Sequence, residues 1–157
     1  MRRMLSRTAP VMALACLAAL GADNTLGTWK ANIAKSKYTP APIPLKSYTM
    51  VREAVPDGVK VTVTGERIDG TQINATYTAK FDGSASPVSG SGTPYDTMAL
   101  KQVNANTFTY DAKNSKTKYH TTGRTTVSSD GKTMTNNARG ANADGNAITL
   151  TLVLEKQ

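Results

Sequence analysis

The sequence predicts an all-β fold: a closed, antiparallel, up-and-down β-barrel of about eight to ten strands. Five Asp-Gly pairs recur along the chain and separate short stretches rich in Thr, Val, Ala and Tyr. Asp-Gly favours two-residue hairpin turns, in which both turn residues need positive φ. Within several stretches apolar residues alternate with polar ones, and no segment shows a helical period. The pairs begin at Asp57, Asp69, Asp82, Asp130 and Asp144.

The N-terminus has the three parts of a signal peptide. Three arginines lie in the first seven residues, a mostly apolar run extends from Ala9 to Leu20, and small residues follow at Gly21 and Ala22. A membrane-spanning helix needs about 20 apolar residues, so this run is too short to cross a bilayer. We therefore expect residues 1–22 to be removed and the mature chain, residues 23–157, to be periplasmic or secreted.

The composition of the mature chain excludes several kinds of site. The leader holds the only cysteine, Cys16, so neither a disulfide nor a thiol-ligated metal is expected after its removal. The mature chain has 16 basic and 11 acidic residues, a net charge of +5. Its lysines are spread over many expected strands, which indicates a solubilising surface and no nucleic-acid partner. Residues 23–157 suffice for a single domain with its own core.

The first elements of the barrel follow from prolines and alternation. A strand is expected over residues 26–33, with Trp29 on its apolar face. Three prolines in residues 35–46 exclude a helix and indicate an extended loop. A further strand is expected over residues 47–54, before the turn that contains Asp57.

The clearest strands come next. Val59, Val61 and Val63 alternate with polar residues, and this period of two places the valines on the buried face. The stretch after Asp69 repeats the pattern, and its expected inward set is Ile73, Ala75, Tyr77, Ala79 and Phe81. Residues 84–93 are rich in Ser, Gly and Pro and are expected to form a short irregular edge element or a loop.

The second half completes the ladder. Strands are expected over residues 95–103, 107–111, 117–128, 132–139 and 146–156. The last strand carries the longest apolar stripe in the chain, which needs a covered interior. Its members are Ile148, Leu150, Leu152 and Leu154. The short connections make successive strands pair antiparallel, and closure of the sheet removes its edges.

Two ends of the chain carry a resemblance to a known superfamily. Gly27-Thr28-Trp29-Lys30 resembles the Gly-x-Trp signature of the calycins, the lipocalins and fatty-acid-binding proteins. Leu154-Glu155-Lys156 resembles the aromatic-Glu-Lys close of the fatty-acid-binding proteins, and Arg124 resembles an arginine of their lumenal strand. The chain is also similar to small bacterial secreted proteins of unsettled function that begin Gly-Thr-Trp-Lys. The resemblance implies a calycin-like barrel with Trp29 as a plug at its closed end.

The chain also departs from that pattern. Fatty-acid-binding proteins hold a carboxylate with an Arg and a Tyr on the last strand, and the matching positions here are Leu152 and Leu154. Their two-helix lid is replaced by the proline-rich residues 35–46. The resemblance therefore implies the barrel and the Trp29 plug, without that family's carboxylate anchor.

A ligand site inside the barrel would be mostly apolar. Arg124 is its candidate anion anchor if the face it shares with Thr122 and Thr126 lines the lumen. If that face points outward, as Val127 on the opposite face suggests, Arg124 is solvated. The walls would be Tyr77, Phe81, Phe108, Tyr110, Leu150, Leu152 and Leu154, although such residues on buried faces also serve simply as core.

Catalytic and metal-binding motifs are weak. His120 is the only histidine and lies on the same Thr-rich face as Arg124, where an exposed strand histidine is the simplest interpretation. One histidine without a mature cysteine makes a zinc site improbable. Gly90-Ser91-Gly92 precedes no helix that could bind phosphate, so a flexible turn is expected. We expect no enzyme, no cofactor and no bound metal.

Two functions fit these expectations. The first is an exported barrel that binds an apolar or amphipathic small molecule without chemistry. The alternative is a solid-core interaction module, an inhibitor or an envelope-associated protein, that acts through the loops at residues 35–46 and 84–93. Lumen volume separates the two, because a cavity of roughly 300 Å³ or more favours ligand binding.

Overall fold

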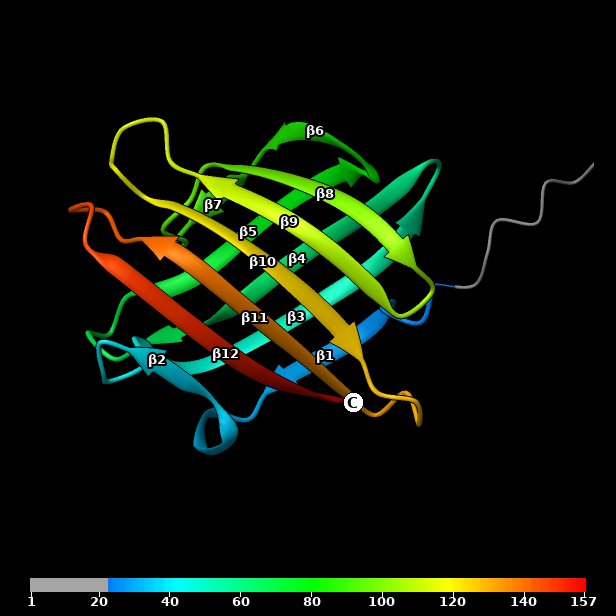
Figure 1. The fold of residues 1–157 in the computed structure, drawn as a ribbon, viewed down its shortest axis with the longest axis horizontal. Helices are drawn as coiled ribbons and strands as arrows, with labels where there is room; N and C mark the ends of the chain where they lie inside the picture. The colour runs from blue at the N-terminus through cyan, green and yellow to red at the C-terminus, as the bar shows by residue number, and fades with distance from the viewer. Residues whose placement is uncertain (1–22) are drawn as a thin grey trace, which may run out of the picture.

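Twelve strands form one antiparallel sheet that curves into a nearly closed barrel (Figure 1). The structure is a computed structural model that describes residues 23–157. The predicted signal peptide, residues 1–22, lies outside the described residues. The up-and-down antiparallel barrel expected from the sequence is confirmed, because each strand within residues 45–80 and within residues 97–156 pairs with the next strand along the chain.

The elements follow one another with short connections. In chain order the strands are β1 (Gly27–Ala31), β2 (Lys37–Thr39), β3 (Leu45–Val55), β4 (Gly58–Arg67), β5 (Gln72–Lys80), β6 (Asp82–Pro87), β7 (Ser89–Ser91), β8 (Thr97–Asn104), β9 (Thr107–Lys113), β10 (His120–Val127), β11 (Thr133–Ala141) and β12 (Ala147–Lys156). A three-residue 3-10 helix, η1 (Ile33–Lys35), separates β1 from β2. No helix in residues 23–157 is long and apolar enough to cross a bilayer.

The first and last strands meet and join the two ends of the meander. β1 pairs with the end of β12, with Ala31 opposite Leu154, while β2 pairs with an earlier part of β12, with Thr39 opposite Thr149. β1 is shorter than the strand expected over residues 26–33, and β2 lies within residues 35–46, which were expected to form an extended loop. The Asn32 side chain accepts a hydrogen bond from the Lys35 backbone N–H and caps η1, which ends β1 and separates it from β2.

A second junction lies between β5 and β8. β6 pairs with β8 and β7 pairs with β5, so residues 82–91 bridge the two sides of the barrel (Figure 1). The sequence predicted a loop or an irregular edge element here. Its residues are mostly exposed and show no apolar alternation, and a Cβ at Gly90 would clash with the Asn74 carbonyl oxygen. The glycine thus serves close backbone approach, which the sequence pattern does not reveal.

The Asp-Gly turns form in a different way from the one predicted. Four of the five pairs lie at hairpin turns, but Asp82-Gly83 begins β6. Asp57 has a φ of 60°, whereas only the glycine has positive φ in the pairs that begin at Asp69, Asp82, Asp130 and Asp144. The aspartate side chain also helps to hold the turn, as at Asp69, whose Oδ1 accepts a hydrogen bond from the Thr71 backbone N–H at 3.0 Å. Such longer turns with one left-handed glycine are common in hairpins.

The inward faces follow the predicted alternation. Val59, Val61 and Val63 are buried, as are Ile73, Ala75, Tyr77 and Ala79 on the neighbouring strand. These side chains, with Ile148, Leu152 and Leu154 of β12, form the wall of the barrel. The period of two in the sequence therefore identifies the inner face correctly for these strands.

One end of the barrel is closed by residues 23–26, which we call the floor. The Asn24 backbone N–H donates to the Ala105 carbonyl at 2.8 Å, so the floor is tied to the turn between β8 and β9. Trp29 has no exposed surface, and its Nε1 donates to the Thr25 carbonyl at 2.9 Å. Lys156 Nζ lies 4.8 Å from the centre of the Trp29 ring. Trp29 thus packs directly against the floor.

Candidate functional site

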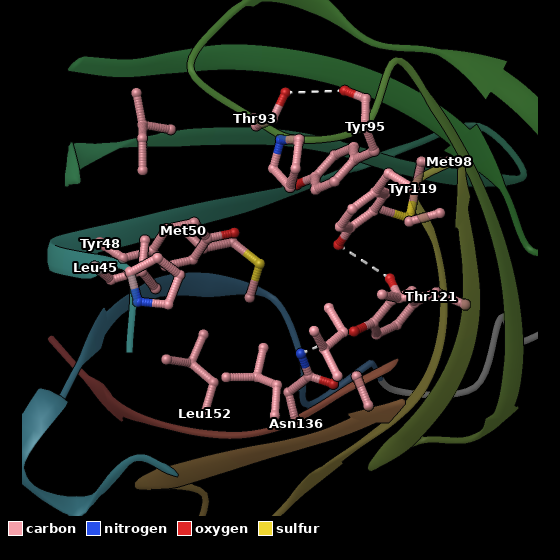
Figure 2. A pocket seen from close by; sticks show the side chains of 18 of the residues that line it. Leu45, Tyr48, Met50, Thr93, Tyr95, Met98, Tyr119, Thr121, Asn136 and Leu152 are labelled. Carbon is pink, nitrogen blue, oxygen red and sulfur yellow. Dashed lines mark hydrogen bonds between the residues drawn. The ribbon is translucent and has the colours of Figure 1, made fainter. Parts of the chain in front are cut away.

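The barrel encloses a cavity of about 370 Å³. Its lining comes from the inner faces of the long strands and reaches residues 43–45, 92–95 and 142–144, the loops at the end away from the floor. We call these three loops the mouth, which lies on the left in Figure 1. Most of the lining is apolar or aromatic, and Figure 2 shows Leu45, Met50, Met98 and Leu152 around the open centre.

All six tyrosines of the chain line this cavity. They are Tyr38, Tyr48, Tyr77, Tyr95, Tyr110 and Tyr119. The rings of Tyr95 and Tyr119 lie with their centroids 6.2 Å apart (Figure 2). Tyrosine offers an apolar ring together with one hydroxyl, so this lining suits a ligand that is mostly apolar with a few polar groups.

Hydrogen bonds fix the orientation of two of these rings. Asn136 Nδ2 donates to the Tyr110 hydroxyl at 3.1 Å, and the hydroxyls of Tyr119 and Thr121 are hydrogen-bonded at 3.1 Å (Figure 2). Burial raises the pKa of Tyr77 to about 12 and also raises the pKa of the other five tyrosines. The hydroxyls therefore stay neutral and can donate hydrogen bonds at physiological pH.

A buried arginine lies at the floor end of the cavity lining. Arg52 of β3 is 2% exposed, and its Nε donates to Thr25 Oγ1 at 3.1 Å. Its Cζ lies 4.2 Å from the centre of the Phe108 ring. Burial lowers the pKa of Arg52, while Tyr77 and Asp23 oppose this shift. Its two terminal nitrogens, Nη1 and Nη2, are buried and have no hydrogen-bond partner in residues 23–157.

Most of the predicted wall residues do line the cavity. These are Tyr77, Phe108, Tyr110, Leu150, Leu152 and Leu154. Phe81 does not, so its place in the predicted site is wrong. It follows the end of β5 and is half-buried against the core outside the cavity lining. The alternating pattern assigned Phe81 to the inner face, but Phe81 comes after the end of β5, on the floor side of the cavity lining.

Arg124 is not a lumenal anchor. It is exposed and borders an open groove on the outer surface of the sheet, while Thr121, Thr125 and Val127 on the other face of β10 are buried. The interpretation with Arg124 in the lumen is therefore wrong, and the alternative in which Val127 marks the inner face is correct. His120 shares the outer face, and its Nε2 lies 3.2 Å from Asp111 Oδ2.

Sequence reasoning missed Arg52, and the reason is visible in β3. Both faces of β3 carry apolar and charged residues. One face has Tyr48, Met50 and Arg52, and the other has Val51 and Glu53. Either register would bury one charged residue, so alternation alone leaves the inner face of this strand undecided. The pairing of Arg52 with Val61 across β3 and β4 decides it, because Val61 faces inward.

Other chemistry-bearing groups are sparse in the described chain. Residues 23–157 contain no group of three or more His, Cys, Asp or Glu side chains placed to hold a metal ion. Their ion pairs, such as the one between Lys35 and Glu155 at 3.0 Å, lie at exposed positions. The cavity is therefore the feature of this structure on which a function can be built.

Comparison with known proteins identifies neither a family nor a ligand for this chain. Neither a known protein family nor a curated protein matches the sequence. Two of the similar solved structures are EF1p2_mFAP2b bound to DFHBI, with 14% identity over 85% of this chain and 94% of that one at a TM-score of 0.48, and the redesigned β-barrel mFAP1 bound to DFHBI, with 15% identity over 82% and 94% at a TM-score of 0.40. Both likenesses are too distant to bear on the ligand of this chain.

Proposed function

We propose that this chain binds an apolar or amphipathic small molecule inside its barrel and performs no chemistry on it. The cavity of about 370 Å³ supports this proposal. It falls within the usual range for small-molecule sites, roughly 300 to 1,000 Å³, and exceeds what a solid-core interaction module needs. Loop-mediated interaction is therefore the weaker account.

The lining indicates what kind of molecule would fit. Leu150, Leu152 and Met134 offer aliphatic wall, and tyrosine rings cover other strands. Each Å² of apolar ligand surface removed from water contributes about 25 cal/mol, so such walls favour an apolar body. The tyrosine hydroxyls and Asn136 supply a small number of polar contacts that would orient this body.

A neutral fluorescent dye tests the proposal. Nile red is expected to bind saturably, at about one dye per chain, with a rise in fluorescence, and to be displaced by long-chain lipids. Ala112 is buried and lines the cavity, so Ala112→Trp should occupy the lumen and abolish this binding. Thr109 lies three residues away on the outer side of the same strand, and Thr109→Trp should leave binding intact. Circular dichroism checks that both variants fold.

The proposal is overturned if Nile red binds without saturation, or if the two tryptophan variants affect its binding equally. Equal effects would place the dye on the outer surface. A folded wild-type chain that binds no apolar dye would leave the loop-mediated alternative as the better account.

We further propose that the protein is exported and acts in the periplasm or outside the cell. The three-part N-terminus supports this proposal. Cleavage after Ala22 would leave the contacts of the floor intact, since Asp23 Oδ1 accepts a hydrogen bond from the Thr25 backbone N–H. N-terminal sequencing of the protein from its own host should find a start near Ala22 or Asp23 in the exported fraction. Cytoplasmic protein that retains residues 1–22 would contradict export.

A further inference from the structure

The Arg52 guanidinium is a buried donor group without enough acceptors. Nε is satisfied by Thr25 Oγ1, but Nη1 and Nη2 have no partner in residues 23–157. Buried polar groups are almost always hydrogen-bonded, and a buried charge without a partner is costly. Nη1 and Nη2 of Arg52 therefore call for a hydrogen-bond acceptor that residues 23–157 do not provide.

The surroundings of Arg52 leave its positive charge largely uncompensated. None of the ion pairs in residues 23–157 includes Arg52. Asp23 offsets part of this charge but makes no direct hydrogen bond to the guanidinium: its Oδ1 accepts from Thr25 Oγ1 at 2.5 Å, and that hydroxyl oxygen in turn accepts from Arg52 Nε. The Phe108 ring covers one face of the guanidinium at 4.2 Å. What remains is the planar edge with two parallel N–H donors, which matches a carboxylate.

The position of Arg52 orients any such ligand. Arg52, Val61 and Tyr77 are successive register partners across β3, β4 and β5, so their side chains stand in one row on the inner wall. Leu45, at the mouth, lies on the same strand about 20 Å from Arg52 along the chain. Met50 is the next inward residue of β3 toward the mouth and also lines the cavity, and its unbranched side chain can adapt to the shape of a ligand.

We infer that the cavity takes an amphipathic carboxylic acid head first, with its carboxylate forked onto the Nη1 and Nη2 of Arg52 and its apolar tail running along the leucine and tyrosine walls to the mouth. This inference rests on the proposed function and narrows its ligand class. The carboxylate supplies the two missing acceptors and neutralises the buried charge. The Tyr77 hydroxyl, a neutral donor in the same row, stands beside this head group.

The test compares an acid with its neutral counterpart. Calorimetric titrations use dodecanoic acid and dodecanol, which share the tail and differ in the head. Wild-type protein should bind the acid about 10- to 100-fold more tightly, the scale of a charge-assisted hydrogen-bonded pair. Arg52→Met keeps the length of the side chain without its charge, and it should remove this preference by weakening binding of the acid far more than binding of dodecanol. Arg124→Met on the outer face is the matched control and should change neither.

A second measurement does not depend on any variant. Dodecanoic acid labelled with ¹³C at its carboxyl carbon should keep one carboxylate chemical shift when bound, down to pH values well below its usual titration range, because the guanidinium favours its ionised form. A bound carboxyl that titrates as it does in water would overturn the inference, and so would equal affinity for acid and alcohol.

The outcomes separate the inference from the proposed function. Binding of dodecanol and Nile red without a preference for the acid would remove the role of Arg52 and preserve the lumenal binding site. An acid preference that survives Arg52→Met but disappears in Arg124→Met would place the head group on the outer surface. Failure of the acid, the alcohol and the dye to bind would overturn both proposals together.

Discussion

Replacing Trp29 by alanine is expected to lower the free energy of unfolding by about 3 to 5 kcal/mol, the range for a fully buried large aromatic side chain. Trp29 has no exposed surface, its Nε1 donates to the Thr25 carbonyl, and Lys156 covers its ring. The substitution would open a void beneath the cavity and release the floor. It thus removes packing and a buried hydrogen bond in one step.

Denaturant-induced unfolding followed by far-UV circular dichroism measures this loss, because the only tryptophan is the residue removed. Trp29→Phe keeps part of the volume and should lose less. Lys30→Ala alters the exposed neighbour on the other face of β1 and should cost under about 0.5 kcal/mol. A loss below about 1 kcal/mol for Trp29→Ala would contradict the packing of Trp29 against the floor.

Above about pH 10 the barrel is expected to unfold steeply, and its tyrosines should ionise in the same transition. Burial raises the pKa of all six tyrosines, with Tyr77 at about 12. Between the unfolded and the folded pKa, the folded state retains protons that the unfolded state has released. The stabilising contribution of the buried tyrosines is therefore fully present below pH 10. The free energy of unfolding then falls as the pH rises toward the tyrosine pKa values of the folded state, by up to about 1.4 kcal/mol per pH unit for each enclosed tyrosine.

Tyrosinate absorbance and far-UV circular dichroism, recorded on the same samples, check this expectation. Both signals should change together, apart from an early fraction from Tyr38, which is the least enclosed of the six. Tyr77→Phe removes one linked proton and should make the alkaline transition shallower. Gradual ionisation centred near pH 10 with an unchanged dichroism spectrum would contradict the enclosure of these rings.

The inner face of the barrel could be predicted wherever the alternation was clean. Along β4 the valines alternate with polar residues, so only one register of the strand buries its apolar side chains. The valines are Val59, Val61 and Val63. The wall positions Tyr77, Phe108 and Leu152 follow from the same rule. These residues were predicted correctly because local pattern and global packing agree for their strands.

The rest of the site depends on contacts that no local pattern encodes. Arg52 lies inside because its strand pairs with Val61, and its one hydrogen-bond partner, Thr25, comes from the floor. Arg124 lies outside because Thr125 and Val127 take the inner face, and threonine is common on both faces of a strand. Backbone pairing holds the bridging strands β6 and β7 in the sheet, so the pattern of their side chains does not reveal that they are strands.

The narrow pairing of β7 has a consequence for how a ligand could reach the lumen. β7 is paired with β5 only from Ser89 to Ser91, all three residues are exposed, and residues 92–95 of the mouth follow directly. Local unfolding begins where few backbone hydrogen bonds and little buried apolar surface must be given up. Transient release of β7 would therefore widen the mouth while β3, β4 and β12 keep their pairing. The dissociation rate of a ligand in the lumen would then depend on how often β7 separates from β5.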